Sequence, residues 1–209
     1  MKMTFVVGLL MIGGAVAAAG GRCRGVWAAS GDNPFRAGPS KARLTSPDGR
    51  YSVAGSRHGL SVRGPTRSVL LAVEANRPLT EVLWSPDSRL LAVNVSDGGL
   101  VGTWEASVFD PTASAPLEQL LVEVRKAVAD FPNCDSPEQA NLAIVGWTQG
   151  GKEMLVVAEV PPHSSCKNMA NIIGFRVDAA NGAILERLPE ALVRRHWSAV
   201  LGCRFSTSE

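Results

Sequence analysis

The chain carries four cysteines and three histidines, the residue types best suited to binding a transition metal. No two cysteines have Cys-x-x-Cys spacing, and a zinc site would need ligands from segments far apart in the chain. His163 and Cys166 could supply half of a site, but a solvated histidine in a loop rich in Pro and Ser is the simpler reading. We therefore expect no metal and no cofactor. Disulfides are expected instead, with all pairings open at this point among Cys23, Cys134, Cys166 and Cys203.

Catalytic motifs are missing from the sequence. There is no Gly-x-Ser-x-Gly nucleophile elbow, and the segment 146–152 lacks the spacing and the Lys-Ser/Thr ending of a phosphate-binding loop. Turn-like positions, where a carboxylate accepts hydrogen bonds from backbone amides, hold Asp48, Asp87, Asp110 and Asp178. No catalytic residue is therefore assigned. A small exported enzyme of unrecognised type stays an alternative, with its site in loops 94–103 and 160–171 and with His163, Asp97 and Glu105 as the residues to test.

The charge is unevenly distributed along the 209 residues, whose formal net charge is +2. Residues 20–45 carry a net charge of +4, which leaves −3 on residues 46–209. Nucleic-acid binders concentrate positive charge on the folded part, because phosphate contacts supply most of their affinity. We therefore expect no nucleic-acid partner.

The first 19 residues are typical of a signal peptide. Lys2 precedes an apolar stretch, and small residues with Ala-x-Ala spacing follow at 15–17 and 17–19. The alternative, an uncleaved membrane anchor, is disfavoured because a spanning helix needs about 20 predominantly apolar residues and this stretch is shorter and rich in Gly. The leader predicts a periplasmic or secreted protein with no stable membrane span after its removal.

Three similar turns organise the rest of the chain. Residues 45–50 and 84–89 share four of six residues, including Ser-Pro-Asp, and residues 147–152 form a more distant copy. Each is followed by a run of residues with high β-propensity. Because Pro presets φ and Asp accepts backbone hydrogen bonds, these segments predict tight β-turns between strands.

These turns resemble the WD40-like repeat of the TolB-type family of exported bacterial β-propellers. Residues 81–111 match the repeat well, residues 141–188 match with a degenerate turn, and residues 43–73 match weakly because they lack the Trp. The resemblance implies a mainly β fold of about three propeller-like antiparallel meander units. Propellers typically have four to eight blades. Three units would therefore form an incomplete propeller or a sandwich-like arrangement, and the helix, the termini or another chain would have to cover the strand edges.

Two helices are expected beside the strands. An apolar stripe predicts an amphipathic helix at about residues 115–131; its members are Leu117, Leu120, Leu121, Val124 and Val128. This stripe could pack against a sheet edge or bind a partner. A short C-terminal helix is expected over residues 191–201, after Pro189 and before Gly202.

The propeller-like unit suggests how the cysteines pair. Cys134 precedes one strand, Cys166 follows the next, and in an up-and-down meander these two points lie at the same end of the unit. The resemblance therefore favours Cys134–Cys166. Cys23–Cys203 remains as the second bridge, which would tie the two termini together.

Three tryptophans leave functional alternatives open. Trp27 and Trp197 could be tethers that pack a terminus against the body, or exposed anchors for a partner. Trp104 and its neighbours could bind a carbohydrate or another small ligand.

The expected organisation is a signal peptide at 1–19, a basic segment containing Gly, Pro and Ser at 20–42, and a propeller-like β domain at 43–209. The function we expect is a non-catalytic protein-binding or scaffold module of the cell envelope or secreted fraction. Its partner is another protein or a second copy of the chain.

Overall fold

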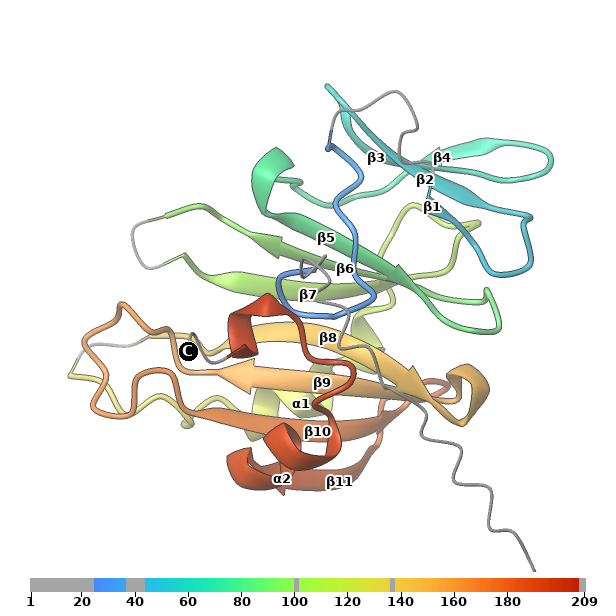
Figure 1. Ribbon diagram of the computed structural model, residues 1–209. Coiled ribbons are helices and arrows are strands. Elements are labelled where there is room, and N and C mark those ends of the chain that lie inside the picture. The colour runs from blue at the N-terminus through green and yellow to red at the C-terminus, as the bar shows by residue number, and fades with distance from the viewer. Residues whose placement is uncertain (1–24, 37–43, 100–101, 136–137, 207–209) are drawn as a thin grey trace, which may run out of the picture.

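Three antiparallel sheets make up the protein in the computed structural model, which describes residues 25–36, 44–99, 102–135 and 138–206. The first sheet contains β1 (Leu44–Thr45), β2 (Ser52–Ser56), β3 (Gly59–Arg63) and β4 (Ser68–Leu70). The second contains β5 (Thr80–Trp84), β6 (Leu91–Ser96) and β7 (Trp104–Phe109). The third contains β8 (Asn141–Thr148), β9 (Glu153–Glu159), β10 (Ile172–Asp178) and β11 (Ile184–Pro189). Each sheet is a meander of consecutive strands, and Figure 1 shows the three sheets following one another in chain order. The expectation of a mainly β fold is confirmed, and the described sheets do not close into a ring.

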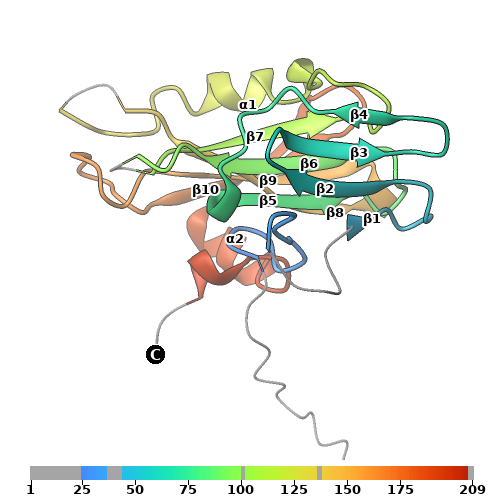
Figure 2. The same cartoon turned by 90° about the horizontal axis from the view of Figure 1, so that it is seen from above.

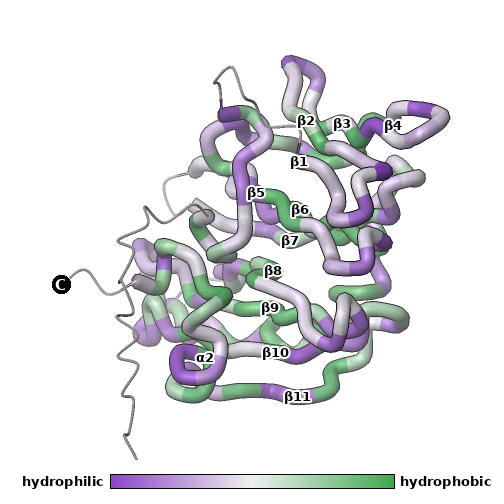
Figure 3. Tube along the Cα trace, turned by 45° about the vertical axis from the view of Figure 1, so that its right-hand side comes forward, coloured by the Kyte–Doolittle hydropathy of each residue, from purple (hydrophilic) through white to green (hydrophobic). Residues whose placement is uncertain are grey.

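The second sheet is the central layer of the core. Leu91, Val93 and Val95 on one face of β6 pack in a cluster with the first sheet, whereas Ala92 on the other face packs in a cluster with the third sheet. Both faces of β6 are therefore buried, and the strand is apolar except for Asn94 and Ser96, which are buried as well. Figure 3 shows the same pattern, with hydrophobic residues along the inner strands and hydrophilic residues at the turns.

The repeated turns lie side by side and hold neighbouring sheets together. Ser88 Oγ accepts a hydrogen bond from the backbone N–H of Asp48 at 3.0 Å, and Trp84 Nε1 donates to the carbonyl of Leu44 at 3.1 Å. The matching position of the third turn is Gly151, which lies against the Asp87 carboxylate. All three turns place a left-handed residue at the same point, with φ of 74° at Gly49, 64° at Ser88 and 99° at Gly151.

The segment expected as one helix at about residues 115–131 is split. It forms a 3-10 turn, η2 (Glu118–Leu120), and a short helix, α1 (Val122–Ala127), separated by Leu121, whose φ of −118° is not helical. The expected inserted helix is present as α1, but it is shorter than the expected range and a 3-10 turn precedes it. The start of the segment is bonded to the sheet, where the Leu117 N–H donates to the Val108 carbonyl at 2.7 Å.

The inserted segment covers the outer edge of β7. Besides the bond from Leu117, Arg125 Nη2 donates to the Ala106 carbonyl at 3.0 Å. The apolar stripe is buried in the core, with Leu120, Leu121 and Val124 each no more than 2% exposed. Of the two alternatives for this stripe, packing against the sheet is the one observed.

The two ends of the described chain are bonded to each other. The Gly202 N–H donates to the Trp27 carbonyl at 2.7 Å, and the Arg204 N–H donates to the Val26 carbonyl at 2.9 Å. The N-terminal segment also pairs with β5, where Asp32 and Val82 exchange both backbone hydrogen bonds. This segment runs from β5 to the C-terminal residues and ties the second sheet to the end of the chain.

The C-terminal helix α2 (Glu190–His196) packs on the third sheet at Gly174, where an added Cβ would meet Val193 and Trp197. The helix begins one residue before the expected range 191–201 and ends five residues before the end of that range. Figure 2 shows α1 and α2 on opposite sides of the sheets. Trp27 and Trp197 are 0% and 6% exposed, so both are packing tethers and not surface anchors. No helix in the described residues is long and apolar enough to cross a membrane.

Candidate functional site

A disulfide fixes the loop that joins β9 to β10. Cys134 and Cys166 are bonded, as expected, and their backbones form an isolated antiparallel bridge. Asn168 clamps the same two segments: its Oδ1 accepts from the Asn133 N–H at 2.8 Å, and its Nδ2 donates to the Phe131 carbonyl at 2.9 Å. Loop 160–171 is therefore held to the segment 131–134 by one covalent bond and by the hydrogen bonds beside it. A disulfide of this kind is typical of an oxidising, extracytoplasmic environment.

The ends of this loop are closed by backbone bonds. The Val160 N–H donates to the Asn171 carbonyl and the Ala170 N–H donates to the Val160 carbonyl, both at 2.9 Å. Ala170 has a φ of 62°, a left-handed conformation that costs a residue with a Cβ roughly 1–2 kcal/mol. The neighbouring side chain, Met169, is 46% exposed. The loop thus holds a large apolar side chain in water on a backbone whose conformation is fixed.

A groove lies beside this loop, between α1 and the start of β8. Its cavity volume is about 470 Å³, its apolar lining includes Val128, Ala140 and Leu142, and Glu138 and Arg125 are charged lining residues. The Glu138 carboxylate reaches toward the N–H and Oγ of Ser165, both at 3.5 Å, which connects the groove to the loop.

A second cavity of about 500 Å³ adjoins the first, since Glu105 and Gln139 line both. Asp97, one of the residues singled out for an enzyme, lines this cavity together with Glu105, but its carboxylate accepts a hydrogen bond from the Gly99 N–H at 2.9 Å, as turn aspartates do. The Oε2 atom of Glu105 lies 3.5 Å from Nη2 of Arg125 and forms an ion pair with it. His163 is exposed on loop 160–171 and lines neither cavity. The structure therefore brings two of the three residues together and leaves the histidine apart.

Trp104 cannot serve as a sugar-stacking platform. Its side chain is 4% exposed and packs edge-on against Trp27, with ring centroids 5.9 Å apart. The alternative of a carbohydrate or small-ligand site at Trp104 loses its exposed ring, because Trp27 of the N-terminal segment packs against it. In the described ranges, no group of three or more His, Cys, Asp or Glu side chains is arranged to hold a metal ion.

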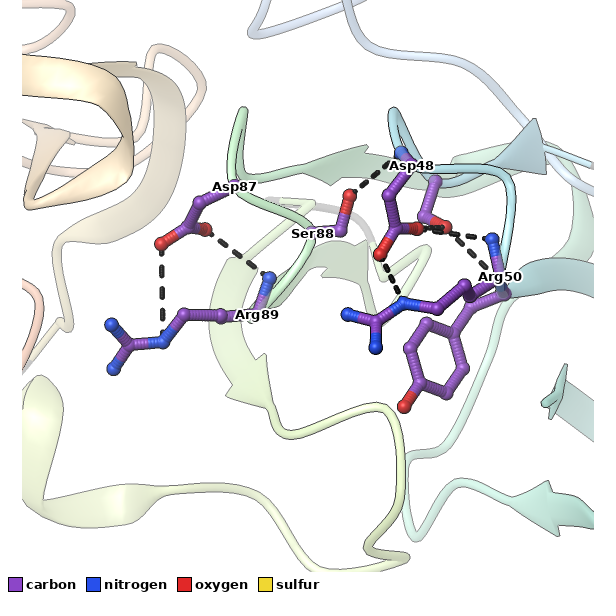
Figure 4. A network of polar contacts seen from close by, with 7 residues as sticks. Asp48, Arg50, Asp87, Ser88 and Arg89 are labelled. Atoms are coloured by element: carbon purple, nitrogen blue, oxygen red, sulfur yellow. Dashed lines mark hydrogen bonds and ion pairs between the residues drawn. The ribbon is translucent and has the colours of Figure 1, made fainter. Parts of the chain in front are cut away.

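The opposite end of the molecule carries the repeated turns (Figure 4). In the first turn, Asp48 accepts a hydrogen bond from Ser46 Oγ at 2.7 Å and pairs with Arg50 Nε at 2.5 Å. These contacts, the Ser46 hydrogen bond foremost, hold the pKa of Asp48 well below its usual range. The second turn repeats the arrangement, with Asp87 bonded to the Arg89 N–H at 3.2 Å and 3.9 Å from its Nε. The aspartates therefore cap their own turns, as the sequence predicts.

Two buried carboxylates join the termini to the sheets. Glu81, 3% exposed, accepts hydrogen bonds from the N–H groups of Trp27 at 3.0 Å and Ala28 at 3.1 Å. Burial raises the pKa of Glu81, and these hydrogen bonds oppose the rise. Glu159, 5% exposed, pairs with Arg204, whose guanidinium also lies 4.8 Å from the centroid of the Trp27 ring. Both carboxylates have structural partners, so neither is assigned a catalytic role.

Cys203 is disulfide-bonded, whereas Cys23, its expected partner, lies outside the described residues. The pairing Cys23–Cys203 therefore stays a prediction, as does the signal peptide at 1–19.

Several residues of interest were missed from the sequence. In the sequence, the one sign of Met169 is that a large apolar residue occurs in a mostly polar stretch of loop 160–171. The partners of Glu81 and Glu159 come from distant segments, and no spacing rule predicts them. No family model, no curated protein and no solved structure matches this chain.

Proposed function

We propose that the chain is a non-catalytic protein-binding module of the cell envelope or secreted fraction, and that loop 160–171 is its binding element. The observation that carries this proposal is the exposed Met169 on a loop held by the Cys134–Cys166 disulfide. When a partner covers an exposed apolar side chain, the removal of that apolar surface from water contributes favourably to the free energy of binding.

The fixed backbone supports this proposal. Association is weakened by the entropy lost when a mobile loop becomes ordered, and a loop that is already ordered avoids most of that loss. The Asn168 clamp and the backbone bonds at Val160 provide this order before any partner arrives. Met also adapts its shape readily, because its side chain is unbranched and polarisable.

The groove extends the proposed surface. Val128, Ala140 and Leu142 supply an apolar lining, and Glu138 links the groove to the loop. An apolar centre with a charged rim is the usual anatomy of a protein interface.

The experiment compares two exposed apolar side chains of nearly equal exposure, Met169 at 46% and Leu185 on β11 at 47%. Tagged wild-type protein, Met169→Asp and Leu185→Asp are used to recover partners from an envelope extract. We expect a stoichiometric partner with the wild type and with Leu185→Asp, and its loss with Met169→Asp. Recovery of no stoichiometric partner, with a monomer in light scattering, would count against the proposal. Loss with Leu185→Asp alone would move the interface to β11.

The enzyme alternative has its own test. Asp97 and Glu105 share a cavity, which is the one observation in its favour. If a hydrolytic or transfer activity is found in the purified protein, alanine replacement of these two residues and of His163 should abolish it. Unchanged activity in all three variants would remove the alternative.

The likeness of the turns to the TolB-type repeat remains part of this proposal, together with export through the leader at 1–19. The side-by-side turns support the likeness. Mass spectrometry of the mature N-terminus in the native host tests the leader: a first residue at or near position 20 is expected, and an intact Met1 would contradict it.

A further inference from the structure

The loop between β9 and β10 presents an oxidisable side chain to solvent. Two methionines lie in the described residues: Met169 on this loop is 46% exposed, and Met154 on β9 is 0% exposed. Figure 1 shows the loop, in orange, extending beyond the ends of β9 and β10. A reagent dissolved in water therefore reaches the side chain of Met169, whereas the core keeps it from Met154.

The backbone on both sides of Met169 keeps this side chain outside the core. The preceding residue, Asn168, clamps the loop through its two side-chain hydrogen bonds. The following residue, Ala170, has a φ of 62° and donates its N–H to the Val160 carbonyl at 2.9 Å. Because these contacts fix the backbone, the exposure of Met169 is a property of the folded protein.

No thiol in the described residues competes for an oxidant. Cys134 and Cys166 are bonded to each other, and Cys203 is disulfide-bonded as well, so the described cysteines have no free thiol. Apart from thiols, the thioether of methionine is a common site of oxidative modification in proteins. Met169 is therefore the methionine of the described chain that an oxidant in solution reaches first.

We propose that Met169 is a site of oxidation by peroxides, and that its conversion to the sulfoxide switches off the binding surface at loop 160–171. A lone pair of the sulfur attacks one oxygen of hydrogen peroxide, a sulfur–oxygen bond forms, and the oxygen–oxygen bond breaks. The sulfur is oxidised by two electrons and the peroxide is reduced. The second oxygen leaves as water after it takes up the proton of the transferred oxygen.

The product changes the chemistry of the surface but not the fold. A sulfoxide is polar, so covering it with an apolar partner costs free energy unless the partner supplies a hydrogen-bond donor. Met169 provides the apolar contact of the proposed function, and the switch therefore rests on that function. The fold is unaffected because Met169 belongs to neither hydrophobic cluster of the core. Methionine sulfoxide reductases restore the thioether, which makes the switch reversible.

The first experiment tests the oxidation site alone. The full mature chain is treated with hydrogen peroxide, and peptide mapping by mass spectrometry follows the gain of one oxygen atom at each methionine. We expect Met169 to be oxidised at least tenfold faster than Met154 in the folded protein, and both at similar rates in guanidinium chloride. The thermal melt should stay within a few degrees of the untreated protein after Met169 has reacted. Similar rates at the two methionines in the folded protein would overturn the assignment.

The second experiment tests the switch. Wild type and Met169→Leu, each untreated or treated with peroxide that is then removed, are used to recover the partner from an envelope extract. Leu keeps an apolar side chain but has no sulfur, so Met169→Leu should recover the partner before and after treatment, whereas the treated wild type should recover at least fivefold less than the untreated one.

Two results would overturn the switch. Equal recovery by treated and untreated wild type, with Met169 fully oxidised, would remove it and leave the proposed function standing. If the untreated wild type recovers no partner, the proposed function fails and the switch fails with it, while the peptide map still decides whether Met169 is the oxidation site.

Discussion

The hydroxyl of Ser88 lies 3.0 Å from the backbone nitrogen of Asp48 and accepts its hydrogen bond, which joins the turns of two neighbouring sheets. Ser88 does this from a left-handed conformation, with a φ of 64°, that serine seldom adopts. The hydrogen bond and the backbone strain therefore act in opposite directions on stability at this position.

Substitutions at Ser88 separate these two effects. Ser88→Ala removes the acceptor but keeps the Cβ, so we expect a loss of about 1 kcal/mol in the free energy of unfolding. Ser88→Gly also removes the acceptor, but it relieves the left-handed strain by about 1 kcal/mol, so its stability should stay close to that of the wild type. Urea denaturation of the three proteins measures both values. Equal destabilisation by Gly and Ala would show that strain plays no part.

The disulfide should stabilise the protein as well as its loop. Replacing Cys134 and Cys166 by Ser opens a closed segment with a sequence separation of 32, and we expect a loss of about 3 kcal/mol. Thermal unfolding of the oxidised wild type and the double variant measures this loss. An unchanged unfolding midpoint would contradict it, and peptide mapping under non-reducing conditions checks the expected Cys23–Cys203 bridge in the same samples.

The Glu159–Arg204 pair predicts a non-additive response. Arg204→Met leaves a buried carboxylate without its cation, and we expect a loss of about 3 kcal/mol or more. Adding Glu159→Gln removes the uncompensated charge, and the double variant should recover part of the loss. Denaturation of the two single variants and the double variant gives the coupling. A double variant that is as unstable as Arg204→Met would show that the charge is not the cause.

Glu81 predicts a pH dependence of stability. Burial raises its pKa above the ordinary value of 4.5, so its carboxyl favours the folded state at a pH below that value. That contribution is lost as the pH rises through the folded-state pKa. Glu81→Gln does not titrate, so the stability of the wild type relative to this variant should fall as the pH is raised from about 4 to 8. Urea denaturation at a series of pH values measures the difference, and a flat or rising difference would contradict the raised pKa.

Local sequence patterns predicted a large part of this fold. The turns at 45–50 and 84–89 form because their Ser-Pro-Asp residues bond within the turn, and the strands after them alternate or run apolar as expected. The Cys134–Cys166 bridge followed from the meander. In each case the decisive interactions join residues close in the sequence or within one meander.

The features that local sequence patterns did not predict depend on contacts between segments far apart in the chain. The segment at about 115–131 is interrupted at Leu121, and its start is bonded to β7 through Leu117; its own apolar spacing reveals neither feature. Trp104 is covered by Trp27, 77 positions away in the chain. Likewise, the exposure of Met169 depends on how the loop is fixed by Asn168 and the disulfide.

The central claim is that loop 160–171 and the adjoining groove form the protein-binding surface. Hydrogen–deuterium exchange of the wild type, with and without the partner recovered in the extract experiment, tests it most directly. We predict slower exchange on partner binding in loop 160–171 and in residues 138–142 beside it, with little change in β1–β4. Protection confined to β1–β4 or β11, with exchange in loop 160–171 unaltered, would contradict the claim.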